Sequence, residues 1–192
     1  EINPTWVVPY RNLGNLLMSS GKPDAGMQVF EDGLRALPEN TELLMHLAGA
    51  YERKQGIDSA IAVYERILKK DSRSQLAANN LASILADHKG DSGSLKRAKS
   101  LALPLESSPQ PAFRDTLGWV YYKSGELDKA VPLLKDVVKQ APAVPVFQYH
   151  LGMAYHKQGN TADAKTHLAK AVEGKNDFPG AEEARVILKQ IP

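Results

Sequence analysis

Histidine side chains are the ones in this sequence best suited to metal binding or acid–base chemistry. There are five, at positions 46, 88, 150, 156 and 167. None belongs to a His-Glu-x-x-His pattern, and His150 and His156 are six residues apart, which places them on different sides of one helix. The sequence also has no glycine-rich phosphate loop and no Gly-x-Ser-x-Gly nucleophile turn. We therefore predict no metal site, no cofactor and no enzymatic activity, and interpret the histidines as polar positions that face solvent or a groove.

The amino-acid composition limits which classes of protein and partner are possible. The chain has 192 residues, of which 43% are apolar and 24% charged, as in ordinary globular protein. Its net charge of +2 predicts no general attraction to nucleic acid or anionic membrane. Cysteine is absent, which excludes disulfides, thiol catalysis and zinc–thiolate sites and fits a periplasm or a cytosol equally well. No apolar run approaches the roughly 18 residues that a membrane span needs, so we expect no membrane insertion by this segment.

Other residues recur at a fixed spacing. Leu117-Gly118 is followed by Tyr121, Gly125 and Ala130, and the same types return 34 positions later, beginning at Leu151. Three upstream segments carry looser copies, which begin at Leu13, Leu47 and Leu81. A period of this length is typical of a solenoid built from helix–turn–helix repeats. The repeat, not the local pattern, therefore predicts the architecture.

Each of these recurring residues has a physical purpose in a pair of helices. Leu117 and Tyr121 are four residues apart and lie on one helical face, where they form the apolar stripe. Gly118 removes side-chain bulk where the second helix crosses the first. Gly125 and Gly159 end the first helix of their pairs, because glycine adopts a left-handed conformation at little cost. A single pair cannot bury its apolar face, so about three or more repeats must stack.

The expected helices follow this period. They span about 6–20, 23–36, 41–54, 57–70, 74–88, 95–106, 112–124, 127–140, 145–158, 161–173 and 181–190. In the third copy the spacing between the two halves is four residues longer than elsewhere, and we assign the excess to a flexible polar loop at 89–94. Pro132 lies inside an expected helix, where it removes a hydrogen bond and predicts a kink. Pro4 stands 34 residues before Pro38, which predicts further repeats N-terminal to this sequence; the alternative is a chance proline.

These residues resemble the tetratricopeptide repeat (TPR) family over nearly the whole chain. Phe30, Gly33 and Pro38 complete the first copy, and Pro142 closes the fourth. The small residue of the second helix is replaced in three copies, by Ile67, Leu105 and Val137. The resemblance implies an all-α, right-handed α-solenoid. It implies five repeats within residues 1–178, at about 7–40, 41–74, 75–110, 111–144 and 145–178, and a C-terminal capping helix in 179–192.

The resemblance also implies where a partner binds. In this family the first helix of each pair lines a concave groove. That geometry also places Asp115 and His150 among the lining positions. From the lining positions we take ten candidates for partner contact: Arg11, Asn15, His46, Asn79, Asn80, Trp119, Tyr122, Tyr149, Met153 and His156. Trp119, Tyr122 and Tyr149 are the leading candidates, because large aromatic residues off the packing stripe anchor peptides or stack on sugars. Packing of Trp119 on a neighbouring helix is an equal alternative. Asn79 and Asn80 could bind an extended backbone or serve the inter-repeat turn.

Two narrower resemblances within the family can be tested on single residues and segments. The first is rejected and the second is kept. Chaperone-binding members hold a C-terminal carboxylate with a clamp of basic and amide residues. Arg11 and Asn15 match its first two positions, but His46, Leu76 and Asn80 replace the others, so we reject a chaperone-tail function. The segments 79–87 and 115–125 are similar to bacterial TPR lipoproteins associated with exopolysaccharide export and exosortase loci. That similarity favours the periplasm or envelope over the cytoplasm.

We therefore expect a non-catalytic scaffold that holds a protein or peptide segment in its groove. Solenoids expose an extended surface and lack a closed pocket, which suits segments better than small substrates. The alternative is a structural or polysaccharide-contacting module of a bacterial envelope export machine. Catalysis would require a further domain N-terminal to these repeats.

Overall fold

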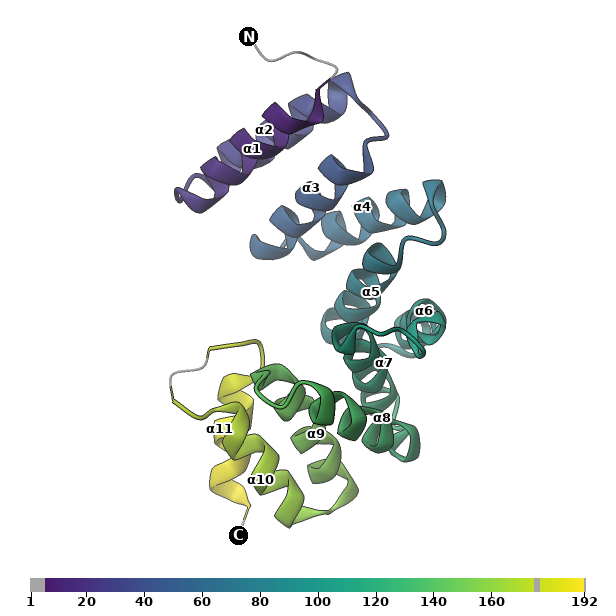
Figure 1. Cartoon of the computed structure of the whole chain (residues 1–192), viewed down its shortest axis with the longest axis vertical. Helices are drawn as coiled ribbons and strands as arrows, with labels where there is room; N and C mark the ends of the chain where they lie inside the picture. Colours follow the sequence, from purple (N-terminus) through teal and green to yellow (C-terminus); the bar gives the residue numbers. More distant parts are fainter. Residues whose placement is uncertain (1–5, 175–176, 192) are drawn as a thin grey trace. The chain divides into compact units, whose positions relative to one another are not determined.

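The computed structural model describes residues 6–174 and 177–191, and every regular element in these ranges is a helix (Figure 1). The prediction of an all-α fold is confirmed. Pro4, from which we expected further repeats, lies outside the described residues. The chain forms two compact units, one ending at Ile84 and the other beginning at Leu85.

Unit 1 is a succession of antiparallel helices. Its elements are α1 (Val7–Ser19), α2 (Pro23–Ala36), α3 (Thr41–Arg53), α4 (Ile57–Lys70) and α5 (Gln75–Ile84). Each helix packs on the next one along the chain, and α1 also contacts α3. The side chains at these contacts are almost fully removed from solvent: Phe30, Leu43, Leu44, Tyr64, Ile67 and Leu81. Burial of one apolar face per helix therefore holds the unit together.

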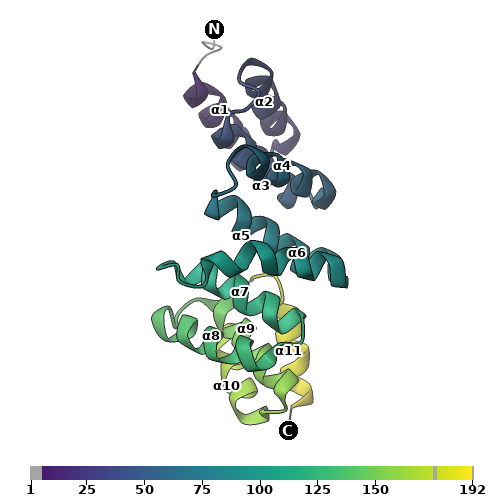
Figure 2. The same ribbon diagram turned by 90° about the vertical axis from the view of Figure 1, so that its right-hand side faces the viewer.

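Unit 2 continues the same alternation. Its elements are η1 (Leu85–Lys89), α6 (Ser92–Ala102), η2 (Leu103–Leu105), α7 (Pro111–Lys123), α8 (Leu127–Gln140), α9 (Pro145–Gln158), α10 (Thr161–Ala171) and α11 (Ala181–Gln190). In both views α9 lies beside α10, and α10 also packs on α11 (Figures 1 and 2). In α8 the buried residues Ala130, Leu134 and Val137 are spaced at four and three, which turns one face to the core.

Small residues stand where two helices approach most closely. A Cβ atom added to Gly118 would lie 2.6 Å from Leu134 Cδ2, and one added to Gly152 would lie 2.7 Å from Leu168 Cγ. Both leucines belong to the second helix of the same pair and are 0% exposed. These distances agree with the purpose that the repeat pattern predicts for the glycine after the leucine.

The turns within the pairs use left-handed residues, as expected for Gly125 and Gly159, whose φ angles are 78° and 83°. Gly21 has the same conformation in the first pair, with φ of 74°. In the second pair the equivalent residue is Gln55, with φ of 57°. A side chain in this conformation is strained, so Gln55 reduces the stability of its turn.

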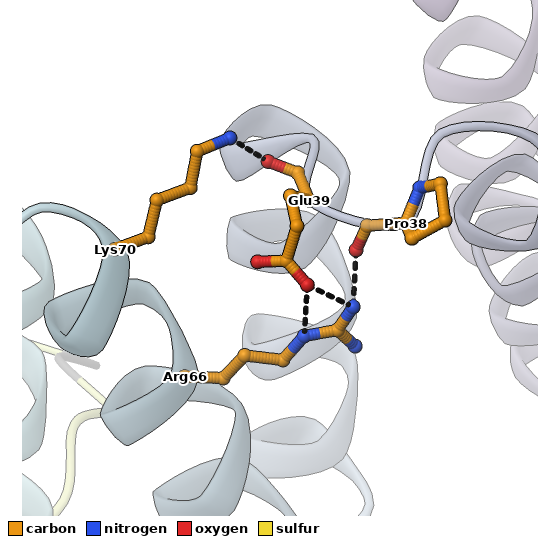
Figure 3. A network of polar contacts seen from close by, with 4 residues as sticks. All are labelled: Pro38, Glu39, Arg66 and Lys70. Carbon is orange, nitrogen blue, oxygen red and sulfur yellow. Dashed lines mark hydrogen bonds and ion pairs between the residues drawn. The ribbon is translucent and has the colours of Figure 1, made fainter.

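A polar network fixes the connection between the first two pairs (Figure 3). The Arg66 guanidinium donates to the Glu39 carboxylate at 2.8 Å and to the Pro38 carbonyl, while the Lys70 ammonium donates to the Glu39 carbonyl. Both cations lie on α4, whereas the three acceptor groups, on Pro38 and Glu39, lie in the turn between α2 and α3. The network therefore sets where α3 begins relative to the helix it packs against.

The insertion in the third copy is more helical than predicted. After α5 the chain makes a π-helical turn, in which the Gly90 N–H donates to the Leu85 carbonyl at 3.1 Å. The expected loop at 89–94 is wrong for its second half, because α6 begins at Ser92 rather than near residue 95. The Asp91 carboxylate accepts the N–H groups of Gly93 and Ser94 and so supplies the N-cap. The glycine and serines suggested a loop, but the cap outweighs their weak helix propensity.

Candidate functional site

The candidates in unit 1 lie in separate polar contacts. Arg11 forms an ion pair with Glu42 at 2.8 Å, and Asn15 is exposed. The His46 ring stacks on Phe30 with centroids 5.4 Å apart, and burial lowers the pKa of this histidine. None of these contacts joins the three candidates into one site.

Asn79 and Asn80 support the interface between α5 and α4. The Asn79 amide donates to the Asn80 carbonyl oxygen at 3.2 Å, and the Asn80 amide donates to the Tyr64 hydroxyl at 3.1 Å. The Tyr64 hydroxyl in turn donates to Glu52. The Asn80 amide therefore binds a buried tyrosine and Asn79 supports Asn80, while contact of either with a partner stays a prediction.

The candidates in unit 2 gather around Trp119. Its ring stacks on Tyr122 at 4.5 Å and on His150 at 4.1 Å between centroids, and Tyr149 lies tilted at 5.6 Å. Trp119 is 5% exposed, Tyr149 3% and Met153 4%. Of the alternatives that the sequence left open for Trp119, the structure thus has the ring packed among its neighbours. Tyr122 is half-buried, and His156 is exposed.

Three carboxylates bind the rings of this group. The Trp119 indole N–H donates to Asp87 Oδ1 at 2.6 Å, and the Tyr149 hydroxyl donates to Glu183 Oε2 at 2.6 Å. His150 Nδ1 lies 2.8 Å from Asp115 Oδ2. We call the seven residues the aromatic–acidic cluster: Asp87, Asp115, Trp119, Tyr122, Tyr149, His150 and Glu183. Each of the three bonds joins two successive first-helix segments of unit 2.

Burial and negative charge shape the titration of the cluster. Burial raises the pKa of Tyr149, and the nearby Glu183 carboxylate raises it further. The same two causes, in the same order, raise the pKa of Tyr122. Burial also raises the pKa of Asp115, although His150 opposes that shift. The second oxygen of Asp115, Oδ1, is buried and has no hydrogen-bond partner among the described residues.

Two lysines lie on the ring faces of the cluster. Lys123 Nζ is 5.2 Å from the centroid of Trp119, and Lys157 Nζ is 4.7 Å from that of Tyr122. Lys157 also donates to the Tyr122 carbonyl at 3.2 Å. Among the described residues neither ammonium forms an ion pair. Their positions show that these ring faces attract cations.

The segment before α11 covers one side of the cluster. The Phe178 ring lies 5.6 Å from Tyr149, and a Cβ atom added to Gly180 would be 2.5 Å from the Tyr149 ring. Gly180 has φ of 101°, so both space and conformation require glycine there. Sequence reasoning missed the contribution of Phe178 and Glu183. The signal was present for Glu183, because it follows Tyr149 by 34 residues and so occupies the next first-helix position.

Within 6–174 and 177–191, no group of three or more histidine, aspartate or glutamate residues is placed to hold a metal ion. No described helix has the length and hydropathy required to cross a bilayer.

The family is decided by comparison of the sequence with known families. A model of the tetratricopeptide repeat matches residues 17–84 and 121–185, which is more than half of the chain. The chain belongs to the tetratricopeptide repeat family. Among curated relatives, it is 25% identical over 136 residues to a TPR repeat-containing protein of Pseudomonas aeruginosa. It is 29% identical over 174 residues to the peroxisomal targeting signal receptor of Candida albicans. The matches cover 71% and 86% of this TPR chain but only 23% and 29% of the relatives' length.

Solved TPR structures share the fold. A TPR protein of Parabacteroides merdae superposes with a TM-score of 0.79 at 15% identity, covering 98% of this chain and 74% of that one. A thermophilic TPR protein of Thermus thermophilus gives 0.72 at 23% identity, with coverage of 95% and 97%. YrrB, described as a TPR protein with an unusual peptide-binding site, gives 0.67 at 20% identity, with coverage of 96% and 94%. At these identities the likeness concerns the fold alone.

Proposed function

We propose that this TPR chain is a non-catalytic interaction module that binds a partner segment along the first-helix side of unit 2, at the edge of the aromatic–acidic cluster. One observation carries the proposal: hydrogen bonds join side chains of successive first-helix segments of unit 2, so the cluster and its edge cross several repeats. Asp87 is joined to Trp119, Asp115 to His150 and Tyr149 to Glu183. A continuous surface that crosses several repeats suits an extended segment better than a compact ligand.

The part of this surface available to a partner is its edge. Trp119, Tyr149 and Met153 are enclosed, whereas Tyr122 is half-buried and Glu183, His156 and Lys157 are exposed. We assign the enclosed rings to the framework and the exposed side chains to contact. The peptide-binding site of YrrB and the targeting-signal function of the Candida relative support a protein segment as the ligand. Partner binding by the unit 1 candidates Arg11, Asn15, His46, Asn79 and Asn80 stays a prediction.

Site-specific photo-crosslinking in the source cell tests the proposal. A photoreactive amino acid replaces His156 on α9 or, as a matched control, the exposed Lys139 on the second helix α8. We expect a defined crosslinked protein from position 156 only, and its loss when Tyr122→Ala is added. Equal crosslinking from both positions, or none from position 156, would count against this surface. The alternative of a polysaccharide-contacting module stays a prediction; retention of extracted exopolysaccharide by the wild type but not by Tyr122→Ala would favour it.

A further inference from the structure

The ring faces of the aromatic–acidic cluster already hold ammonium groups. Lys157 Nζ lies 4.7 Å from the Tyr122 centroid and Lys123 Nζ lies 5.2 Å from that of Trp119, and the two rings stack on each other. Both distances are within the range in which a cation is attracted by an aromatic face. This aromatic pair is therefore a binding surface for cations, occupied in this structure by side chains of the same chain.

Carboxylates surround the rings. Asp87, Asp115 and Glu183 each bond a different ring of the cluster. Asp115 is 4% exposed, faces the cluster through its bond to His150, and retains a buried oxygen with no hydrogen-bond partner among the described residues. The exposed residues Asp87 and Glu183 carry carboxylates that favour a positively charged ligand over a negatively charged one.

Lys157 is held weakly enough to be displaced. It is exposed, and within the part of the chain that the structure describes its ammonium contacts one ring face and one backbone carbonyl. A cation–π contact at an exposed site is among the weaker interactions in a protein. A partner's cation would meet the Tyr122 ring and the same carbonyl, and the exposed Glu183 carboxylate is near enough to raise the pKa of Tyr122.

We infer that the edge of the aromatic–acidic cluster recognises a lysine or arginine side chain of the partner segment, which takes the place of Lys157 on the face of Tyr122. The inference rests on the proposed function and adds the chemistry of the ligand. It makes Lys157 an internal competitor, so removal of this lysine should strengthen binding. An acidic segment that paired with Lys123 and Lys157 would show the opposite dependence.

Nuclear magnetic resonance of the whole chain tests this directly. The chain has two tryptophans, and the indole N–H of Trp119 bonds Asp87 in the cluster, while Trp6 lies in unit 1. The probes are two acetylated, amidated octapeptides in a Gly-Ser host, one with two lysines and one with two glutamates. We expect only the lysine peptide to shift the Trp119 indole resonance saturably, with the Trp6 resonance unchanged.

Variants give the decisive comparison. Lys157→Met should raise the affinity for the lysine peptide by about two- to fivefold, and Tyr122→Leu should lower it by a similar factor, as expected for one exposed cation–π contact. Lys139→Met makes the same charge change on α8 and should leave the affinity near that of the wild type. An unchanged pattern of amide resonances away from the site confirms that each variant is folded.

Three results would overturn the inference. They are a shift caused by the glutamate peptide alone, a Lys157→Met variant that binds the lysine peptide more weakly than the wild type, and no shift with either peptide. The photo-crosslinking from position 156 does not depend on the charge of the ligand. If a partner is crosslinked and any of these results is also found, the proposed interaction surface is kept and only the cationic nature of the ligand is rejected.

Discussion

Two glycines in helix interiors should respond to alanine with opposite sign. Gly49 lies within α3, and a Cβ atom there would have only Arg53 Nη1 nearby, at 3.7 Å. Gly118 lies within α7, where the same atom would be 2.6 Å from Leu134 Cδ2 and 2.7 Å from its Cγ. Both substitutions gain the helix propensity of alanine, worth about 0.8–1 kcal/mol. Only Gly118→Ala must also move a side chain that is 0% exposed.

The expected magnitudes follow from these distances. Carbon atoms in ordinary contact are about 3.5–4.0 Å apart, so Leu134 must move by about 1 Å within a closely packed core. Overpacking of this kind costs about 1–3 kcal/mol. Gly118→Ala should therefore lower the free energy of unfolding by up to about 2 kcal/mol net of the propensity gain, while Gly49→Ala raises it by up to about 1 kcal/mol. Gly118→Leu should be less stable than Gly118→Ala.

Urea unfolding followed by far-ultraviolet circular dichroism measures the free energy of unfolding of both variants. Fluorescence of the buried Trp119 reports the unfolding of unit 2. The reasoning is refuted if Gly118→Ala is stabilised as much as Gly49→Ala. That result would mean that α7 and α8 can separate without loss, and that the glycine after the leucine is not a packing requirement. An unchanged melting temperature for Gly118→Leu would reject the repeat register itself.

Other substitutions test single features. Gln55→Gly should raise the free energy of unfolding by about 0.5–1 kcal/mol, because Gln55 has φ of 57°; a loss of stability on urea unfolding would contradict this. Asn40→Ala should cost about 1 kcal/mol in the same assay, because the Asn40 side chain accepts the Leu43 N–H at 3.0 Å as the N-cap of α3. Burial lowers the pKa of His46, so its unfolded form binds more protons near pH 6.5; its contribution to stability is present above that pH and lost as pH falls. The stability of His46→Gln relative to the wild type should thus improve between pH 7 and 5, and a constant difference would exclude this. Trp119→Ala should cost about 3–5 kcal/mol and unfold unit 2 rather than only weaken binding, which a loss of helicity by far-ultraviolet circular dichroism would reveal.

The repeat period was sufficient to predict the helices and their contacts. Leu117, Gly118 and Gly125 each have one physical requirement in a helix pair, and such requirements are local enough to be visible in the sequence. The sequence predicted less well where the first helix of the third repeat ends. A π-helical turn over Leu85–Lys89 replaces the expected α-helix, and it places Asp87 beside Trp119. No propensity of single residues indicates that turn.

The packing of Trp119 could not be predicted, because Asp87, which accepts its indole N–H, lies in a π-helical turn outside the regular register. A first-helix aromatic faces an open groove only if neighbouring repeats leave it uncovered. Here Asp87 comes from the inserted turn, and Tyr149, which lies beside Trp119, is itself covered by Phe178 and bonded to Glu183 from the segment around α11. The alternatives for Trp119 therefore stayed equal at the level of sequence.

Enclosure of the central rings changes which groups can give a partner binding energy. The Trp119 indole and the Tyr149 hydroxyl already have strong acceptors, so a partner gains no hydrogen bond from either. What the cluster can offer a partner is the half-buried face of Tyr122, on which the exposed Lys157 lies. Because that face favours positive charge, the framework that removes the other aromatic rings from contact also fixes the charge of the side chain that this surface can accept.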